Sequence, residues 1–400
     1  MAKLCFYFQV HQPYRIRPMR IFDVGTGLKY FNDKTDTNLN NERLMTKVAS
    51  KCYLPMGRLW LEILKNNPDW RISFSISGIT LEQMRDFSPE TLHLFRLLAE
   101  TGQVEFLAET YYHSLSFLYD KDEFTRQVNK QANLIEELFD QKPKILRNTE
   151  LIYHNELAQW AAEAGYRGVL AEGADKLLGW RSPNHLYYPT GQNKIKLLLK
   201  NYKLSDDIAF RFSDPHWPER PLTAEKFASW VGQTFAAGGE IINLFMDYET
   251  FGEHQWADTG IFDFIRNLPQ ALSQIENLEI VTPSMAVKTL PAVGEIDCPD
   301  YVSWADTERD LSAWLENEMQ LEAISRLYGL GSVIIKSQRP DLIEDWRRLQ
   351  TSDHFYYMCT KWWQDGDVHA YFNPYASPYD AFMSFINALN DLQLRLANRK

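Results

Sequence analysis

The feature that most constrains the fold is a repeated alternation of short strand-like runs with longer segments of helical periodicity. Apolar and β-branched runs typical of strands occur at 4–10, 71–77, 103–109, 144–150, 167–173, 241–246 and 278–281. Helical spacing of apolar residues fills the intervals at 38–67, 80–100, 121–140, 154–164, 223–237 and 260–275. Such alternation predicts parallel strands joined by helical crossovers. This many successive units favour a closed α/β barrel over an open sheet.

Two stretches depart from this rhythm. Between 174 and 212, glycine and proline residues separate short runs, and we expect further strands at 186–188, 195–199 and 207–212. From about residue 308 the pattern becomes helical, with segments at 308–328, 340–350 and 377–398 and almost no strand between them. The sequence therefore predicts an α/β barrel over residues 1–290 and a C-terminal helical region over residues 291–400 that packs on it.

The bulk properties narrow the functional classes. The 400 residues carry a net charge of −11, which argues against nucleic acid as a partner because phosphate binding needs a basic surface. Cys5, Cys52, Cys298 and Cys359 are far apart, so we expect a reducing compartment and neither a disulfide framework nor a zinc knot. The apolar run 4–10 is too short for a signal peptide, and no run of about 18 apolar residues occurs. We therefore expect a cytoplasmic protein with no membrane partner.

Polar residues gather where the predicted strands end. The apolar run 241–246 stops abruptly at Asp247, and Glu249, Glu253 and His254 follow it closely. Other predicted strands end in the same way, at His11, Glu109 with His113, Glu150 and Glu172. Any one of these residues is equally well explained as a solvated strand end or a helix cap. Because a buried unpaired carboxylate is costly, the whole set predicts a functional cleft at the shared mouth of the barrel.

The residue types at these strand ends favour acid–base chemistry. Paired carboxylates on different strands suit glycoside hydrolysis. A metal site would need clustered histidine and aspartate ligands, but Gln12 and Pro13 follow His11 and no second histidine lies at ligand spacing, so we expect neither metal nor cofactor. No G-x-S-x-G, P-loop or dinucleotide-binding motif occurs. A metal-dependent deacetylase or mannosidase and a non-catalytic glucan-binding protein remain as alternatives from other classes.

Five short stretches, in order along the chain, resemble the conserved regions of the family 57 glycoside hydrolases. They are His-Gln-Pro at 11–13, the stretch 102–113, Arg-Asn-Thr-Glu-Leu-Ile-Tyr at 147–153, Met-Asp-Tyr-Glu-Thr-Phe-Gly-Glu-His at 246–254 and Tyr-Val-Ser-Trp-Ala-Asp at 301–306. The resemblance implies an incomplete (β/α)7 barrel with a C-terminal α-helical bundle and an α-amylase-like activity on α-glucans. The family also contains 4-α-glucanotransferases, branching enzymes and α-galactosidases, which the five stretches do not separate.

The resemblance implies a role for each matching residue. Glu150 is the expected nucleophile and Asp247 the expected acid/base, in a retaining cleavage of α-1,4-glucosidic bonds through a covalent glycosyl-enzyme. The residues expected to bind or orient substrate are His11, Gln12, Glu109, His113, Arg147, His254, Trp256 and Trp304. A structural ion pair is the alternative for Glu109, and core packing competes with a sugar platform for the two tryptophans. Since the fifth region opens the helical part, residues 291–400 should complete the cleft.

The expected partner is an α-glucan or a maltooligosaccharide, while the oligomeric state stays open. Aromatic residues make up 14% of the chain, and their flat rings can stack on sugars as well as on each other. Most should belong to the core. Trp217 and the pair Trp362 and Trp363 stand among polar residues and turn formers, so we expect these to be exposed.

Overall fold

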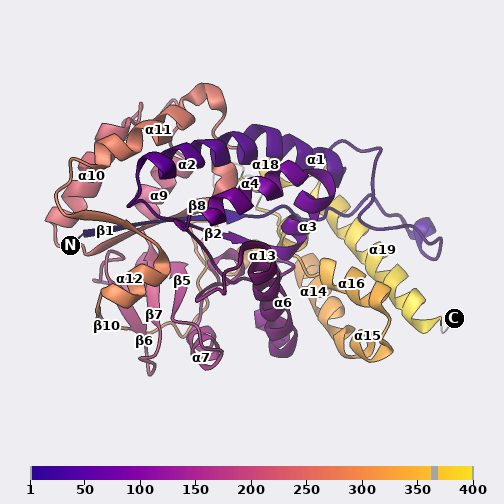
Figure 1. Ribbon diagram of the computed structural model, residues 1–400. Coiled ribbons are helices and arrows are strands. Elements are labelled where there is room, and N and C mark those ends of the chain that lie inside the picture. Colours follow the sequence, from indigo (N-terminus) through magenta and orange to yellow (C-terminus); the bar gives the residue numbers. More distant parts are fainter. Residues whose placement is uncertain (1, 362–367, 399–400) are drawn as a thin grey trace.

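The computed structural model describes residues 2–361 and 368–398 and shows a strand-rich half beside a helical half (Figure 1). The strands are β1 (Ala2–Val10), β2 (Ile72–Ile76), β3 (Val104–Phe106), β4 (Ile145–Arg147), β5 (Gly168–Glu172), β6 (Leu186–Pro189), β7 (Lys196–Lys200), β8 (Ile241–Asp247), β9 (Leu278–Val281) and β10 (Ala292–Ile296). They form two sheets, one ordered β3-β2-β1-β8 with β9 beside β1, the other ordered β10-β6-β7-β5-β4.

The two sheets close on each other to make the barrel. Within them, β1 to β5, β7 and β8 all pair in parallel. A parallel bridge between Ala108 and Leu146 joins β3 to β4. On the opposite side β7 meets β8 more loosely, where Asn201 N donates to Asn243 O over 2.9 Å and Asn243 Nδ2 donates to Leu199 O over 3.0 Å. The predicted incomplete (β/α)7 barrel is therefore confirmed.

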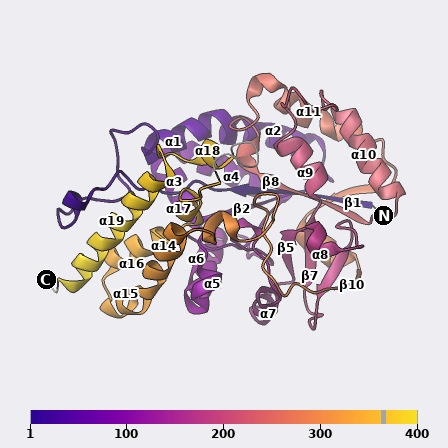
Figure 2. The same cartoon turned by 180° about the vertical axis from the view of Figure 1, so that it is seen from behind.

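Helices surround the strands and then gather beyond them. Those of the barrel half are α1 (Asn41–Val48), α2 (Leu54–Asn66), α3 (Gly78–Phe87), α4 (Pro89–Glu100), α5 (Ser116–Tyr119), α6 (Lys121–Phe139), α7 (Asn155–Glu163), α8 (Asp175–Leu178), α9 (Tyr202–Ala209), α10 (Ala224–Ala236), α11 (Ile261–Leu272) and α12 (Pro283–Thr289). The C-terminal helices are α13 (Ser312–Leu315), α14 (Glu318–Gly329), α15 (Gly331–Ser337), α16 (Pro340–Arg348), α17 (Ser352–Tyr356), α18 (Val368–Phe372) and α19 (Pro378–Ala397). Seen from behind, α14, α15, α16 and α19 lie together on one side of the barrel (Figure 2).

The core explains why the long apolar runs form central strands. Every residue of β8 from Ile241 to Met246 is buried, and β1 is buried along nearly its whole length. A strand covered on both faces is apolar along most of its length, and the polar residue inside β8, Asn243, donates its side-chain N–H to Leu199 O. The C-terminal helices have a core of their own around Trp314 and Trp346, and residues of the early segment such as Ile16 and Met19 are part of it. The segment that follows β1 is therefore packed into the helical half.

One expectation about local structure is wrong. The strand expected at 207–212 does not form, because α9 runs to Ala209 with Asn201 capping its first turn and with Leu204 and Ile208 on its buried face. An additional strand, β10, which was not expected from the sequence, follows residue 290 and pairs with β6. Within the described residues, no helix has both the length and the apolar character needed to cross a membrane.

Candidate active site

The candidate nucleophile stands on a strained turn directly after β4. Glu150 and Leu151 adopt φ angles of 58° and 51°, in the left-handed region. Such backbone costs a non-glycine residue about 1–3 kcal/mol, so surrounding contacts must hold the turn in place. The Glu150 carboxylate accepts hydrogen bonds from Trp304 Nε1 at 2.8 Å and from Ser352 Oγ at 2.9 Å. Residues from beyond position 300 therefore fix a carboxylate that β4 delivers.

A buried histidine joins this carboxylate to a second one. His113 Nε2 donates to Glu150 Oε1 and His113 Nδ1 to Glu109 Oε2, each over 3.2 Å. Burial by itself would lower the pKa of His113, but the hydrogen bonds to Glu109 and Glu150 raise it to about 9. The ring is thus an imidazolium at neutral pH. Behind it, Arg147 Nη1 lies 3.9 Å from Glu109 Oε2, and neither side chain has exposed surface.

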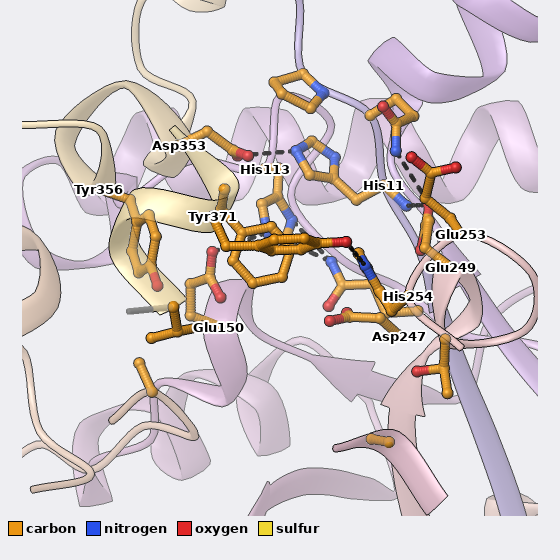
Figure 3. Close-up of a pocket in the computed structure, with 18 of the residues that line it drawn as sticks. His11, His113, Glu150, Asp247, Glu249, Glu253, His254, Asp353, Tyr356 and Tyr371 are labelled. Atoms are coloured by element: carbon orange, nitrogen blue, oxygen red, sulfur yellow. Dashed lines mark hydrogen bonds and ion pairs between the residues drawn. The ribbon is translucent and has the colours of Figure 1, made fainter. Parts of the chain in front are cut away.

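The two candidate catalytic carboxyl groups have opposite pKa shifts. Burial would raise the pKa of Glu150, but the hydrogen bond and charge of His113 and the charge of Arg147 lower it below its usual value. Burial, and then the negative charge of Glu150, raise the pKa of Asp247 to about 6. Asp247 ends β8, and both carboxyl groups line one cavity of about 530 Å³ (Figure 3). Of two carboxyl groups with pKa values shifted in opposite directions, the one with the lower pKa can act as the nucleophile and the one with the higher pKa as the acid.

A third carboxyl group, Glu249, lies on the other side of Asp247. Its Oε1 accepts from the Tyr53 hydroxyl, from His11 N at 3.3 Å and from Gln12 Nε2 at 3.4 Å. Burial and the charge of Asp247 raise the pKa of Glu249 to about 8, so it holds its proton at neutral pH. Two adjacent acids cannot both ionise cheaply in a buried site. A protonated Glu249 therefore leaves Asp247 free to exchange its own proton with a substrate.

Known proteins resemble this chain in sequence and in fold. A sequence model of glycosyl hydrolase family 57 matches residues 5–299. The chain belongs to this family. It is 43% identical to a protein of Methanocaldococcus jannaschii named "Putative alpha-amylase", over 98% of this chain and 84% of that one. Among solved structures, the alpha-amylase AmyC of Thermotoga maritima matches with a TM-score of 0.62 and 13% identity, covering 99% of this chain and 94% of AmyC. The 4-alpha-glucanotransferase of Thermococcus litoralis matches with a TM-score of 0.66 and 17% identity, over 88% of this chain and 56% of the transferase.

Membership of family 57 makes this chain a glycoside hydrolase.

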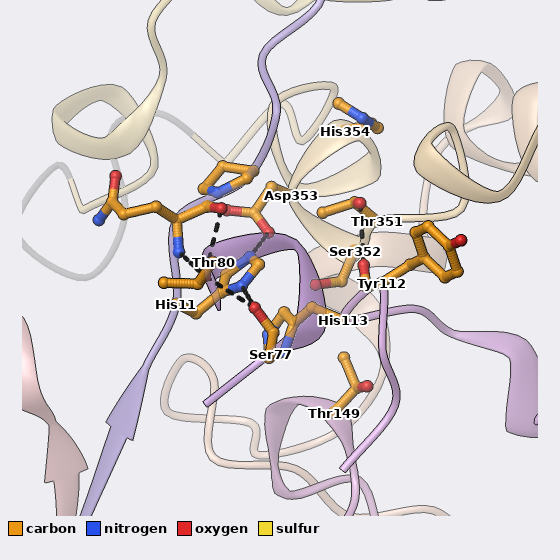
Figure 4. Close-up of polar contacts among 12 residues, drawn as sticks. His11, Ser77, Thr80, Tyr112, His113, Thr149, Thr351, Ser352, Asp353 and His354 are labelled. Carbon is orange, nitrogen blue, oxygen red and sulfur yellow. Dashed lines mark hydrogen bonds and ion pairs between the residues drawn. The ribbon is translucent and has the colours of Figure 1, made fainter. Parts of the chain in front are cut away.

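His11 lies at the end of β1, where its Nδ1 accepts from Ser77 Oγ at 2.8 Å and its Nε2 donates to Asp353 Oδ2 at 3.0 Å (Figure 4). Burial, and then the positive charge of His113, lower the pKa of His11, so its ring is neutral. Burial would raise the pKa of Asp353, but its contact with His11 keeps it well below the usual range. Asp353 is thus an ionised acceptor that can receive a sugar hydroxyl.

His11, His113 and Asp353 also raise the question of a metal ion. One possible ligand atom from each lies within 4.8 Å of the others, although the three are far apart in sequence. The two imidazole rings, however, stack with centroids 3.9 Å apart and planes inclined by 24°. Lone pairs in the planes of stacked rings run nearly parallel and do not converge on one ion. Both ring nitrogens of His113 already serve carboxylates, so the cluster suits hydrogen bonding better than metal ligation.

The remaining residues expected to bind substrate fall into two groups. Gln12, His254 and Trp304 line the cavity together with His11 and His113. Glu109 and Arg147 lie behind the cavity wall, where Glu109 contacts His113 and the guanidinium carbon of Arg147 lies 4.8 Å from the ring of Trp304. The alternative of a structural ion pair for Glu109 therefore fits its position.

The aromatic residues distribute unevenly around the cavity. Trp256 is 60% exposed and lies outside the cavity lining. Trp304 lines the cavity, but its ring faces Arg147 and Lys200, and its N–H serves Glu150. Trp217 is half-buried against Trp230 at 6.0 Å. The expected exposed pair, Trp362 and Trp363, lies outside the described residues.

Two functional residues escaped the sequence reasoning. Ser352 and Asp353 open α17 and reach Glu150 and His11 from the helical half. The local signal was a polar run, Thr351 to His354, inside an otherwise amphipathic helical region. That run is short and has no strand before it, so only the tertiary structure reveals its place at the site.

Proposed function

We propose that this enzyme is a retaining α-glucan hydrolase of the α-amylase type, with Glu150 as nucleophile and Asp247 as acid/base. The observation that carries the proposal is the pair of strand-end carboxyl groups with opposite pKa shifts that line one cavity. The similarity to the protein of Methanocaldococcus jannaschii over almost the whole chain supports α-glucan as the substrate class. The occurrence of the five sequence regions in the order expected for family 57 supports the assignment of the two carboxyl groups.

In the first step, Glu150 attacks the anomeric carbon while Asp247 protonates the leaving glycosidic oxygen. The C1–O bond breaks and a glycosyl ester to Glu150 forms. In the second step a water molecule attacks C1, Asp247 accepts its proton, and Glu150 leaves as carboxylate. The three donors on Glu150, from His113, Trp304 and Ser352, hold it ionised and oriented before attack.

The test is incubation with maltooligosaccharides and amylose, followed by sizing of the products. Glu150→Gln and Asp247→Asn should each reduce turnover by several orders of magnitude, since each removes a group that bonds or protonates the reacting centre. Both variants should still bind maltooligosaccharide and keep the parental circular dichroism. Near-parental turnover by either variant would remove that residue from its role.

Transfer to a sugar acceptor is the second candidate on the same site. Its support is the group of aromatic side chains at the rim of the cavity, which includes Tyr371 and Phe372 and offers surface on which an acceptor sugar can stack. Products longer than the substrate in the sizing experiment would identify a 4-α-glucanotransferase, and new branch points a branching enzyme. Shorter products alone would identify a hydrolase.

A further inference from the structure

A tyrosine from the helical half reaches across the cavity to the barrel. Tyr371 in α18 and His254 in the loop after β8 both line the cavity, and Tyr371 OH lies 3.3 Å from His254 Nδ1. Figure 3 shows the Tyr371 side chain pointing toward His254, with the two candidate catalytic carboxyl groups on either side. This contact joins segments that are 117 positions apart in the chain. It is a cavity feature that the catalytic steps described above do not use.

The helix that carries Tyr371 is anchored from its opposite face. His369 is buried, its Nε2 lies 2.9 Å from Asp306 Oδ1, and its ring stacks on Tyr356 with centroids 4.4 Å apart. Because this anchor faces the core, Tyr371, two residues further along α18 and therefore on roughly the opposite face, lies at the cavity together with Phe372. Tyr371 keeps 61% of its surface exposed, so core packing does not account for its position. An exposed aromatic ring held in a polar cavity is a platform for the apolar face of a sugar.

The chemistry of the site indicates which sugar would occupy this platform. The glycosyl unit that becomes attached to Glu150 must lie among the groups that surround it, which include His113 and, beyond His113, His11 with Asp353. Asp247 protonates the leaving oxygen, so the leaving group lies on the side of Asp247. His254 lies in the loop that follows Asp247 and lines the same cavity. The contact between Tyr371 and His254 is therefore a feature of the leaving-group half.

Resting on the proposed function, we propose that Tyr371, held by His254, forms the subsite for the α-linked glucosyl unit that leaves in the first step and for the sugar acceptor of a transfer step. When an acceptor sugar occupies the subsite, its O4–H attacks C1, the ester bond to Glu150 breaks, and Asp247 takes the proton. When water occupies it, the same steps give hydrolysis. The occupancy of this subsite sets the balance between the two outcomes.

The geometry of His254 supports this role. Burial lowers the pKa of His254 to about 4, so its ring is neutral at working pH. A neutral ring that accepts from the Tyr371 hydroxyl at Nδ1 carries its proton on Nε2. That N–H can donate to a sugar hydroxyl while the phenol ring supplies the stacking face.

Two substrates separate a leaving-group subsite from any other role of Tyr371. α-Maltosyl fluoride reacts with loss of fluoride and brings no leaving sugar, whereas maltotetraose must place sugars in the leaving-group half. Tyr371→Ala should lower kcat/KM for maltotetraose by about three- to tenfold, the loss expected for one aromatic contact, and change fluoride release by less than about twofold. The maltose concentration that gives half-maximal transfer from the fluoride should rise by a similar factor.

The controls use matched aromatic residues. Tyr371→Phe keeps the ring and loses the hydroxyl contact with His254, so it should retain most of the maltotetraose activity. Tyr379→Ala removes a tyrosine of similar exposure, 63%, from α19 outside the cavity lining, and should match the parent on both substrates.

Equal loss on both substrates in Tyr371→Ala would overturn the inference, because a glycone contact or a folding defect acts on both. Unchanged kinetics on both would overturn it as well. If the parent enzyme itself neither releases fluoride nor cleaves glucans, the proposed function fails and the inference fails with it.

Discussion

Replacing His113 by glutamine tests whether a buried imidazolium keeps the nucleophile ionised. His113 lies between Glu109 and Glu150, at 3.2 Å from an oxygen of each. Glutamine can keep a neutral hydrogen bond to one of these oxygens but brings no charge. Arg147, at 3.9 Å from Glu109, then remains as the nearest cation that the described residues place against this pair. We expect the pKa of Glu150 to rise in the variant, because the charge that lowered it is gone.

The size of the effect follows from the distance. Two unit charges 3.2 Å apart interact by about 5 kcal/mol at an effective dielectric constant of about 20. The effect on Glu150 is smaller than this value, because the His113 charge also interacts with Glu109 and because the site relaxes when that charge is removed. Retaining even a third of it corresponds to a change of about one pH unit in the pKa of Glu150, at 1.36 kcal/mol per unit.

The assay is the pH dependence of kcat/KM on a maltooligosaccharide. The acid limb of this profile reports the pKa of Glu150, and its midpoint should rise by about one pH unit in His113→Gln. His185→Gln is the matched control, since the His185 ring lies 3.1 Å from Glu240 at a partly exposed position away from the cavity lining, and the variant should leave the limb in place. An acid limb that stays put in His113→Gln would refute the reasoning.

The raised pKa of His113 should also make the stability of the folded protein depend on pH. The folded pKa of His113 is about 9, above the value of about 6.5 expected in the unfolded chain. Its contribution, about 3 kcal/mol, is therefore fully present below pH 6.5 and is lost as the pH rises through 9. Denaturant unfolding of the parent should show this loss between those values, and the difference between parent and His113→Gln should shrink over the same range.

Three further outcomes are expected. Chelators should leave glucan cleavage unchanged, because the stacked rings of His11 and His113 do not converge on an ion; loss of activity that zinc restores would favour the deacetylase or mannosidase alternative. Proton NMR of the first-formed product should show the α anomer, since a nucleophilic Glu150 requires the two carboxyl groups to lie roughly 5–5.5 Å apart, with no water between Glu150 and the sugar; an early β anomer would remove Glu150 from that role. Truncation after Pro291 should abolish soluble activity, because Trp304 and Ser352 hold Glu150 in place; an active 1–291 fragment would contradict this.

The sequence predicted those parts of the site that are tied to strand ends. A buried parallel strand is nearly continuously apolar, so the point where such a run stops at Asp247 was visible without coordinates, and the polar stretch 147–150 marked the end of the fourth predicted strand. The parallel arrangement then brings strand ends to one mouth. The same logic could not find Ser352 or Asp353, because a helix N-terminus gives no signal of which distant strand it faces. Their contacts span 202 and 342 positions of the chain.

The sequence also could not predict which site residues are buried behind the cavity wall. Glu109 and His113 both follow β3, yet one is sealed behind the wall and the other faces the cavity. The difference arises at the turn, where His113 adopts a φ of 52° and its ring covers Glu109. Left-handed geometry at a non-glycine residue has no reliable sequence signature. The misplaced strand at 207–212 has a similar origin, since the cap at Asn201 rather than the apolar run determined the outcome.

The ability of Asp247 to act first as an acid and then as a base depends on the charge of Glu150. Burial, and then the charge of Glu150, raise the pKa of Asp247 to about 6. The charge disappears when Glu150 becomes a glycosyl ester. Glu150→Gln mimics this neutral state, so the pKa of Asp247 should fall by about one pH unit in the variant. Carbon-13 NMR of labelled aspartate measures the shift, with Asp247→Asn identifying the resonance. Ser352→Ala removes a donor from Glu150 but keeps its charge, and should leave the pKa of Asp247 near 6. An unchanged titration in Glu150→Gln would mean that burial alone sets this pKa, and the exchange of roles between the two steps would need another cause.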